Sequence, residues 1–185
     1  MRLPILAGGV VLAAVPPAAF AAEVQQTTPA DWTETTGEAT AARLIQACVA
    51  PPYDTPSKKM ACFRVALDAC LRDNGSNQSQ YDLNVCGDYS AQAWRARYDR
   101  VMARADALMA RWAQAPADSG KASIAARFSE QEQLWRDWSK ADCEMRGKLS
   151  VGGSIHGFSV TLCASRHVAA RTLDLENQID WWESR

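Results

Sequence analysis

The residues best suited to chemistry lie in a glycine-rich segment enclosed by Cys143 and Cys163. This segment contains serines and His156, which are the residue types needed for a nucleophile beside a general base. It lacks the Gly-x-Ser-x-Gly turn of hydrolases, and no acid between Arg146 and Cys163 could orient the histidine. The glycines are not followed by the basic residue of a phosphate-binding loop. We therefore expect no enzymatic activity and no cofactor.

Metal binding and disulfide formation are two other uses for these residues. Zinc could be held by a set of cysteines and histidines, in which two members lie one helical turn apart: Cys143, His156, Cys163 and His167. The competing interpretation uses all six cysteines of the chain, Cys48, Cys62, Cys70, Cys86, Cys143 and Cys163, as three disulfides. An even count favours disulfides, and no two cysteines have the Cys-x-x-Cys spacing of a redox site.

The pairing of the cysteines is not determined by the sequence, because six cysteines allow about 15 arrangements. Nearest neighbours along the chain each flank a turn, so pairing them would close three helical hairpins. In the last hairpin the glycines permit a tight reversal between antiparallel helices, and the cysteine pair restricts the unfolded chain. On this structural interpretation His156 is a solvated loop residue.

The amino terminus predicts export. Residues 1–21 combine an early positive charge, an apolar run and a small-residue end, which is the pattern of a cleavable signal peptide. No cysteine near the expected cut offers a lipid anchor, so we expect a periplasmic or secreted protein without membrane insertion. Loss of Arg2 changes the net charge from -1 to about -2, which gives no electrostatic reason to bind nucleic acid.

The elements that must position the loop are helices. After a Thr-rich lead over 22–38, expected to be flexible, residues 39–183 are predicted to form one helical domain. Two short helices flank a Pro-rich turn, with Ser57 as the cap of the second. Three longer helices follow, over about 80–114, 121–148 and from about Val160 onward. The fold class is therefore all-α, a disulfide-stapled antiparallel bundle.

Apolar residues in steps of three and four predict which face of each long helix is buried. The expected buried positions are Tyr98, Val101, Ala105, Leu108 and Trp112 on the first, Ile124, Phe128, Trp135, Trp138 and Met145 on the second, and Val168, Thr172, Leu175, Ile179 and Trp182 on the third. The seven tryptophans are interpreted as core residues rather than as a ligand-binding box.

One pattern resembles a known family. Trp135 is followed by Cys143, by Gly-Gly-Ser at 152–154, by Cys163 and then by an Arg-x-Leu sequence at Arg171. Together with Asn-Val-Cys at 84–86 and its following tryptophan, this pattern resembles the domain of the lysozyme inhibitor LprI over about residues 62–173. The chain departs from the family pattern at several positions after Trp94 and around Trp138, which are occupied here by Arg95, Tyr98, Asp99, Met102, Ser139 and Lys140.

The resemblance implies an envelope protein that binds and inhibits a lysozyme-type muramidase. Binding would involve the constrained loop residues Gly152, Gly153, Ser154 and His156, which could meet the two carboxylates of a muramidase cleft. Acids on the contact face would suit a basic lysozyme, and the candidates are Asp82, Asp88, Asp99, Asp106, Glu130, Glu132 and Asp142. The alternative is a disulfide-stabilised helical interaction module with another envelope partner and no effect on lysozyme.

Overall fold

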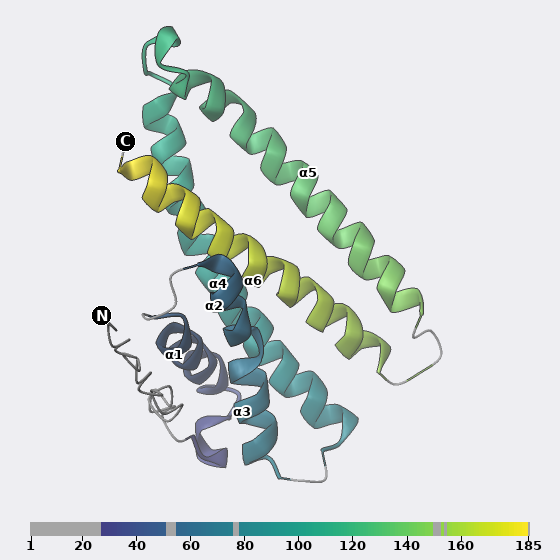
Figure 1. Ribbon diagram of the computed structural model, residues 1–185. Coiled ribbons are helices and arrows are strands. Elements are labelled where there is room, and N and C mark those ends of the chain that lie inside the picture. The colour runs from purple at the N-terminus through teal and green to yellow at the C-terminus, as the bar shows by residue number, and fades with distance from the viewer. Residues whose placement is uncertain (1–26, 51–54, 76–77, 150–152, 154, 185) are drawn as a thin grey trace, which may run out of the picture.

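The computed structural model describes residues 27–50, 55–75, 78–149, 153 and 155–184, and all of its regular elements are helices (Figure 1). The predicted signal peptide, 1–21, lies outside these residues. In chain order the elements are η2 (Pro29–Asp31), α1 (Gly37–Val49), α2 (Pro56–Lys59), η3 (Met60–Arg64), α3 (Val65–Asp73), α4 (Gln80–Trp112), η4 (Ala117–Ser119), α5 (Lys121–Lys148) and α6 (His156–Glu183). The predicted all-α fold class is confirmed.

The three long helices form the frame of the molecule. Helix α6 crosses α4 in the most extensive helix–helix contact, and α5 runs antiparallel beside α6 (Figure 1). The short helices α1 and α3 pack around the N-terminal half of α4. Within the described residues no helix is long and apolar enough to cross a membrane.

The disulfides follow the nearest-neighbour pairing that the turns favoured. Cys48 pairs with Cys62, Cys70 with Cys86, and Cys143 with Cys163. The first pair ties α1 to η3, the second ties α3 to α4, and the third ties α5 to α6. The second and third bridges therefore join consecutive helices, and the first spans the short helix α2.

Two helix starts show how local chemistry sets the boundaries. At α2 the N-cap is Thr55, not the predicted Ser57. Pro56 occupies the first helical position, so the cap is the residue immediately before Pro56. The Thr55 hydroxyl accepts from the amide of Lys58 at 3.4 Å. Helix α4 begins with a reciprocal capping box between Ser79 and Asp82. These hydrogen bonds lower the pKa of the Asp82 carboxyl.

Part of the predicted flexible lead is packed against the bundle. The buried indole of Trp32 donates to a carboxylate oxygen of Asp73 at 2.9 Å, and the hydroxyl of Thr27 donates to the same oxygen. Trp32 also stacks with Tyr89 on α4, with ring centroids 6.3 Å apart. Residues 27–36 therefore belong to the folded body, held by an acid at the end of α3.

Helices α4 and α6 bury the stripes that their periodicity predicted. All five predicted α4 residues are buried, and on α6 three of the five, Thr172, Leu175 and Ile179, are fully buried. The α4 residues, Leu175 and Ile179 meet Phe128 of α5 in a hydrophobic cluster around the C-terminal half of α4. A second cluster surrounds Trp94 and contains the first two disulfides.

The predicted buried face of α5 is wrong at three positions. Ile124, Trp138 and Met145 are exposed, whereas Glu132 and Ser139 are buried. Glu132 can face the interior of the bundle because Tyr98 on α4 and Arg171 on α6 donate hydrogen bonds to its carboxylate. The tryptophans consequently divide: Trp32, Trp94 and Trp112 are core residues, but Trp138 and Trp181 are exposed.

Candidate functional site in the α5–α6 hairpin

Side chains of α6 pack directly against the backbone of α5 near the tip of the hairpin. A Cβ atom added to Gly147 would lie 2.5 Å from Cγ2 of Val160, far inside normal van der Waals contact. Glycine is therefore required here by the approach of α6. One helical turn earlier on α5, Cys143 is bonded to Cys163. The two contacts together fix the separation of the helices where they enter the connecting loop.

The predicted binding residues fall partly within the described chain. Gly152 and Ser154 lie outside it, and Gly153 is exposed. His156 is the first residue of α6. The helix therefore begins four residues before the predicted start at Val160. Its Nδ1 lies 2.7 Å from the carbonyl oxygen of Gly147. His156 is thus half-buried rather than a solvated loop residue, since it satisfies a carbonyl at the end of α5.

The contact with Gly147 also selects the tautomer of His156. A carbonyl oxygen can only accept, so Nδ1 must carry the proton that it donates. In the neutral ring, Nε2 is then an acceptor, and in the protonated ring it is a second donor. The orientation of the ring is set by the hairpin itself.

The tip of the hairpin exposes large apolar side chains. Leu149, which follows α5, is 89% exposed, and Ile155, which precedes α6, is 46% exposed. Met145 is exposed one turn before Leu149. Such side chains gathered at one end of a helical hairpin are typical of the centre of a protein–protein contact rather than of a solvated turn.

The zinc site considered from the sequence is replaced by a disulfide and a hydrogen bond. Asp142, Cys143, Cys163 and His167 offer ligand atoms within 4.8 Å of one another, but the two sulfurs are bonded to each other and are not thiolates. Nε2 of His167 lies 2.8 Å from a carboxylate oxygen of Asp142. His156, the other predicted ligand, lies instead against Gly147.

Asp142 stabilises the hairpin as an ionised carboxylate. The side-chain hydrogen bond from Arg146, followed by the one from His167, lowers the pKa of Asp142. A carboxyl whose pKa is lower in the folded than in the unfolded chain stabilises the fold above its unfolded pKa of about 3.9. That stabilisation disappears as the pH falls through the folded pKa.

We therefore predict a pH-dependent effect for Asp142→Asn. The variant should unfold at lower urea concentration than the parent protein at pH 5 and above, and the difference should shrink below about pH 4 as the carboxylate of the parent is protonated. Urea titrations at several pH values measure this. Asp137→Asn is the control, because among the described residues Asp137 accepts a hydrogen bond only from Gln133. A difference for Asp142→Asn that is equal at low and neutral pH would contradict the role of its charge.

A buried polar network joins the hairpin to α4. Glu132 on α5 is 1% exposed and accepts from Nε of Arg171 on α6 at 2.9 Å. The hydroxyl of Tyr98 on α4 donates to the other carboxylate oxygen at 3.1 Å. Burial, and then the neighbouring charge of Glu132, raise the pKa of Tyr98 to about 12, so the phenol remains a donor at neutral pH. Arg171 also contacts Asp174 at 2.9 Å.

This network was missed at the sequence level, where Glu132 was a candidate for an acidic contact face. A signal was present, because Glu132 lies between Phe128 and Trp135 in steps of four and three, on the same helical face. Its burial excludes it from such a face. Asp142 is held by Arg146 and His167, whereas Asp88, Asp99, Asp106 and Glu130 are exposed.

A groove of about 360 Å³ lies beside the network, between α4, α5 and α6. Its polar lining includes Arg95 and Asp99 of α4 and Ser139 and Lys140 of α5. The ring of Trp135 borders it and packs against Tyr98, with centroids 5.6 Å apart. The hairpin thus presents an apolar tip at one end and, along the face that meets α4, a groove of mainly apolar surface that also contains charged side chains.

Comparison with known families decides the relationship. The model of the family described as lysozyme inhibitor LprI matches residues 70–175, which is more than half of the chain. This protein belongs to the LprI family. No curated protein and no solved structure matches the chain. The match covers all of α4 and α5, most of α6, and the second and third disulfides.

The structure gives physical roles to the LprI-like residues noted in the sequence. Arg171 is the partner of buried Glu132, and Leu173 is a fully buried core residue. Trp135 packs on Tyr98. The positions where this chain departs from the LprI pattern behave differently, since Arg95, Asp99, Ser139 and Lys140 all line the groove. The shared residues therefore build the helical frame, and the altered positions divide between the groove and the core cluster, which contains Tyr98 and against which Met102 packs.

Proposed function

We propose that this LprI family member is an exported, non-enzymatic protein that binds and inhibits lysozyme-type muramidases in the cell envelope. The observation that carries the proposal is the family match over residues 70–175. The three disulfides support a periplasmic or secreted location, because such bonds persist in oxidising compartments. The amino-terminal pattern of residues 1–21 supports the same location.

The contact that we propose is the tip of the α5–α6 hairpin. Gly152, Gly153, Ser154 and His156 would enter the cleft of the enzyme, with Leu149 and Ile155 as apolar anchors on either side. The disulfide and the contact of His156 with Gly147 hold both ends of this segment. A segment with fixed ends loses less conformational freedom on binding, and this favours its insertion.

The chemistry of a muramidase cleft suits His156. Such a cleft contains two carboxyl groups, of which one is protonated and acts as an acid while the other is ionised. Because Nδ1 of His156 donates to Gly147, Nε2 is the nitrogen left for the enzyme. A neutral ring would accept from the protonated carboxyl through Nε2, and a protonated ring would donate to the ionised one. The Ser154 hydroxyl would add a second hydrogen bond.

A turbidity assay tests the proposal. Oxidised mature protein, residues 22–185, is mixed with lysozyme and bacterial cell walls over a range of protein concentrations. We expect dose-dependent protection of the walls. Leu149→Ser should raise the half-inhibitory concentration by about tenfold, because truncating a central apolar anchor weakens such contacts by 1 to 2 kcal/mol or more. Leu134→Ser is the matched control, an exposed leucine on α5 away from the tip.

The possible results separate the two functions considered. No protection at high micromolar protein would reject inhibition of the lysozyme tested and would favour a helical interaction module with another partner. Protection that Leu149→Ser and Ser154→Ala leave unchanged would support inhibition but reject the tip as the contact. Repetition at higher salt shows whether charged groups contribute, because exposed ion pairs are screened.

A further inference from the structure

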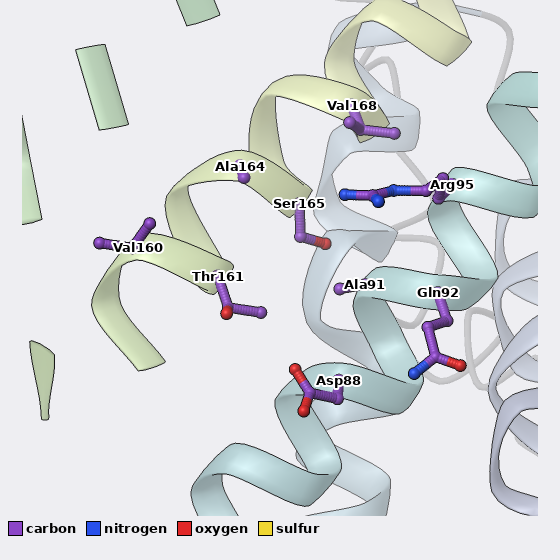
Figure 2. A pocket seen from close by; sticks show the side chains of 9 residues that line it. All are labelled: Asp88, Ala91, Gln92, Arg95, Val160, Thr161, Ala164, Ser165 and Val168. Carbon is purple, nitrogen blue, oxygen red and sulfur yellow. The ribbon is translucent and has the colours of Figure 1, made fainter. Parts of the chain in front are cut away.

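A second hollow lies between α4 and α6. It is closer to the N-terminus of α4 than the groove described above. Figure 2 shows it, with side chains of both helices directed into the space between them. Its volume is about 280 Å³, at the small end of the range for ligand sites. Polar atoms come from Asp88, Arg95, Thr161 and Ser165, and Val168 contributes apolar surface at one end. The hollow therefore combines both signs of charge with neutral donors and acceptors.

The hydroxyl of Ser165 is buried without a hydrogen-bond partner in the described structure. The residue is 5% exposed, and its hydroxyl makes no hydrogen bond with any part of the chain that the structure describes. On the same helix Thr172 avoids this by donating to the carbonyl oxygen of Val168 at 2.7 Å. A buried hydroxyl without a partner is unfavourable, because nothing compensates the loss of its hydrogen bonds to water. A ligand in the hollow would supply the missing hydrogen bond.

Arg95 is also unlike its neighbours on α4. Arg97 pairs with Glu176 of α6 at 2.8 Å, and Arg104 contacts Asp180 at 3.0 Å. Opposite Arg95, however, the lining from α6 consists of uncharged residues, Val160, Thr161, Ala164, Ser165 and Val168. Figure 2 shows the guanidinium of Arg95 extending between the helices above Ser165. It forms no ion pair with any described residue, so a carboxylate from outside the chain could take that place.

Asp88 provides the opposite charge at the other end of the hollow. It precedes Arg95 by seven residues, which places the two on one face of α4, roughly 10 Å apart along the helix axis. Its carboxylate points toward Thr161 in Figure 2 and, within the described structure, has no cationic partner. Asp88 also borders a contiguous hollow of about 220 Å³ next to Phe158. The combined space is elongated along the two helices.

We propose that this hollow binds a short peptide with free termini, two or three residues long. The carboxylate of the peptide would accept hydrogen bonds from Arg95 and Ser165, and its ammonium group would meet Asp88. An extended peptide spans about 3.3–3.6 Å per residue, so this length matches the spacing of the two charges. The site lies on α4 and α6 rather than at the hairpin tip, and it does not depend on muramidase inhibition.

The test is a titration of the full oxidised protein with tri-alanine, followed by ¹H–¹⁵N NMR. We expect saturable shifts of amides around Ser165 and Asp88. N-acetylated and C-amidated tri-alanine should each bind at least about tenfold more weakly, since each lacks one charge-assisted contact. Arg95→Gln should weaken the free peptide by a similar factor and should also abolish discrimination between the free acid and the amide. Arg100→Gln, an exposed change outside the hollow, should alter neither.

Three outcomes would overturn the proposal. The first is the absence of shifts at tens of millimolar tri-alanine. The second is equal binding of the blocked and free peptides, and the third is unchanged discrimination in Arg95→Gln. Ser165→Ala gives a separate check, because loss of an unpartnered hydroxyl should weaken the peptide without destabilising the free protein. Far-UV circular dichroism verifies that each variant is folded.

Discussion

Replacing Arg171 with methionine is expected to lower the free energy of unfolding by about 3–5 kcal/mol. The change leaves the carboxylate of Glu132, which is 1% exposed, buried without its cationic partner. The hydroxyl of Tyr98 would remain as a donor, but a single neutral hydrogen bond does not compensate a buried charge. Urea unfolding at neutral pH, followed by far-UV circular dichroism, measures the loss.

Two further variants identify the cause of that loss. The double change Glu132→Leu with Arg171→Met removes both charges and should recover much of the stability, because apolar residues often replace a buried ion pair with little penalty. Arg104→Met removes an arginine that is about half exposed and should cost less than about 1 kcal/mol. A loss for Arg171→Met no greater than that for Arg104→Met would show that the buried pair is not important for stability.

Removing the hairpin disulfide should reduce both stability and inhibition. Cys143 and Cys163 are separated by 20 residues. Opening a loop of that size is expected to lower the free energy of unfolding by about 3 kcal/mol through the freedom gained by the unfolded chain. In the Cys143→Ser, Cys163→Ser variant the ends of the tip are also held less firmly, so wall protection in the turbidity assay should weaken by more than the unfolded fraction explains.

The disulfide between Cys70 and Cys86 provides the control. It joins α3 to α4 rather than the two helices of the hairpin, and both cysteines are fully buried in the cluster around Trp94. Its removal should lower stability by a similar amount, because its loop of 16 residues is only slightly shorter, while folded protein still protects the walls. Equal loss of protection per folded molecule in the two disulfide variants would indicate that the tip is not the contact.

Local patterns explain what could be predicted from the sequence. Helix periodicity on α4 and α6 identified their buried stripes, and short turns between cysteines favoured the observed pairing. The α5 face was misjudged because hydrophobicity alone cannot show that Glu132 has partners on two other helices. The N-cap of α2 was misplaced for a local reason, since Ser57 was considered without the effect of the neighbouring Pro56.

The candidate site was harder to predict because it depends on which helices face one another. That Nδ1 of His156 meets Gly147, and that Arg95 has no acid opposite it, follow from the registers of α6 against α5 and α4. Neither register is encoded in a run of neighbouring residues. The family resemblance could indicate the fold, but the polar positions where this chain departs from it became informative only when they were found along one groove.

The tight packing at Gly147 implies that the segment connecting α5 to α6 can be exchanged while the two helices keep their positions. Gly147 against Val160, together with the bridge from Cys143 to Cys163, fixes the spacing of the helices through residues of α5 and α6 themselves. Natural variation, or a graft of a foreign peptide, could therefore alter that short connection while the packing of α4, α5 and α6 is retained. Diversification of targets within such a protein would need changes in a few residues rather than a new fold.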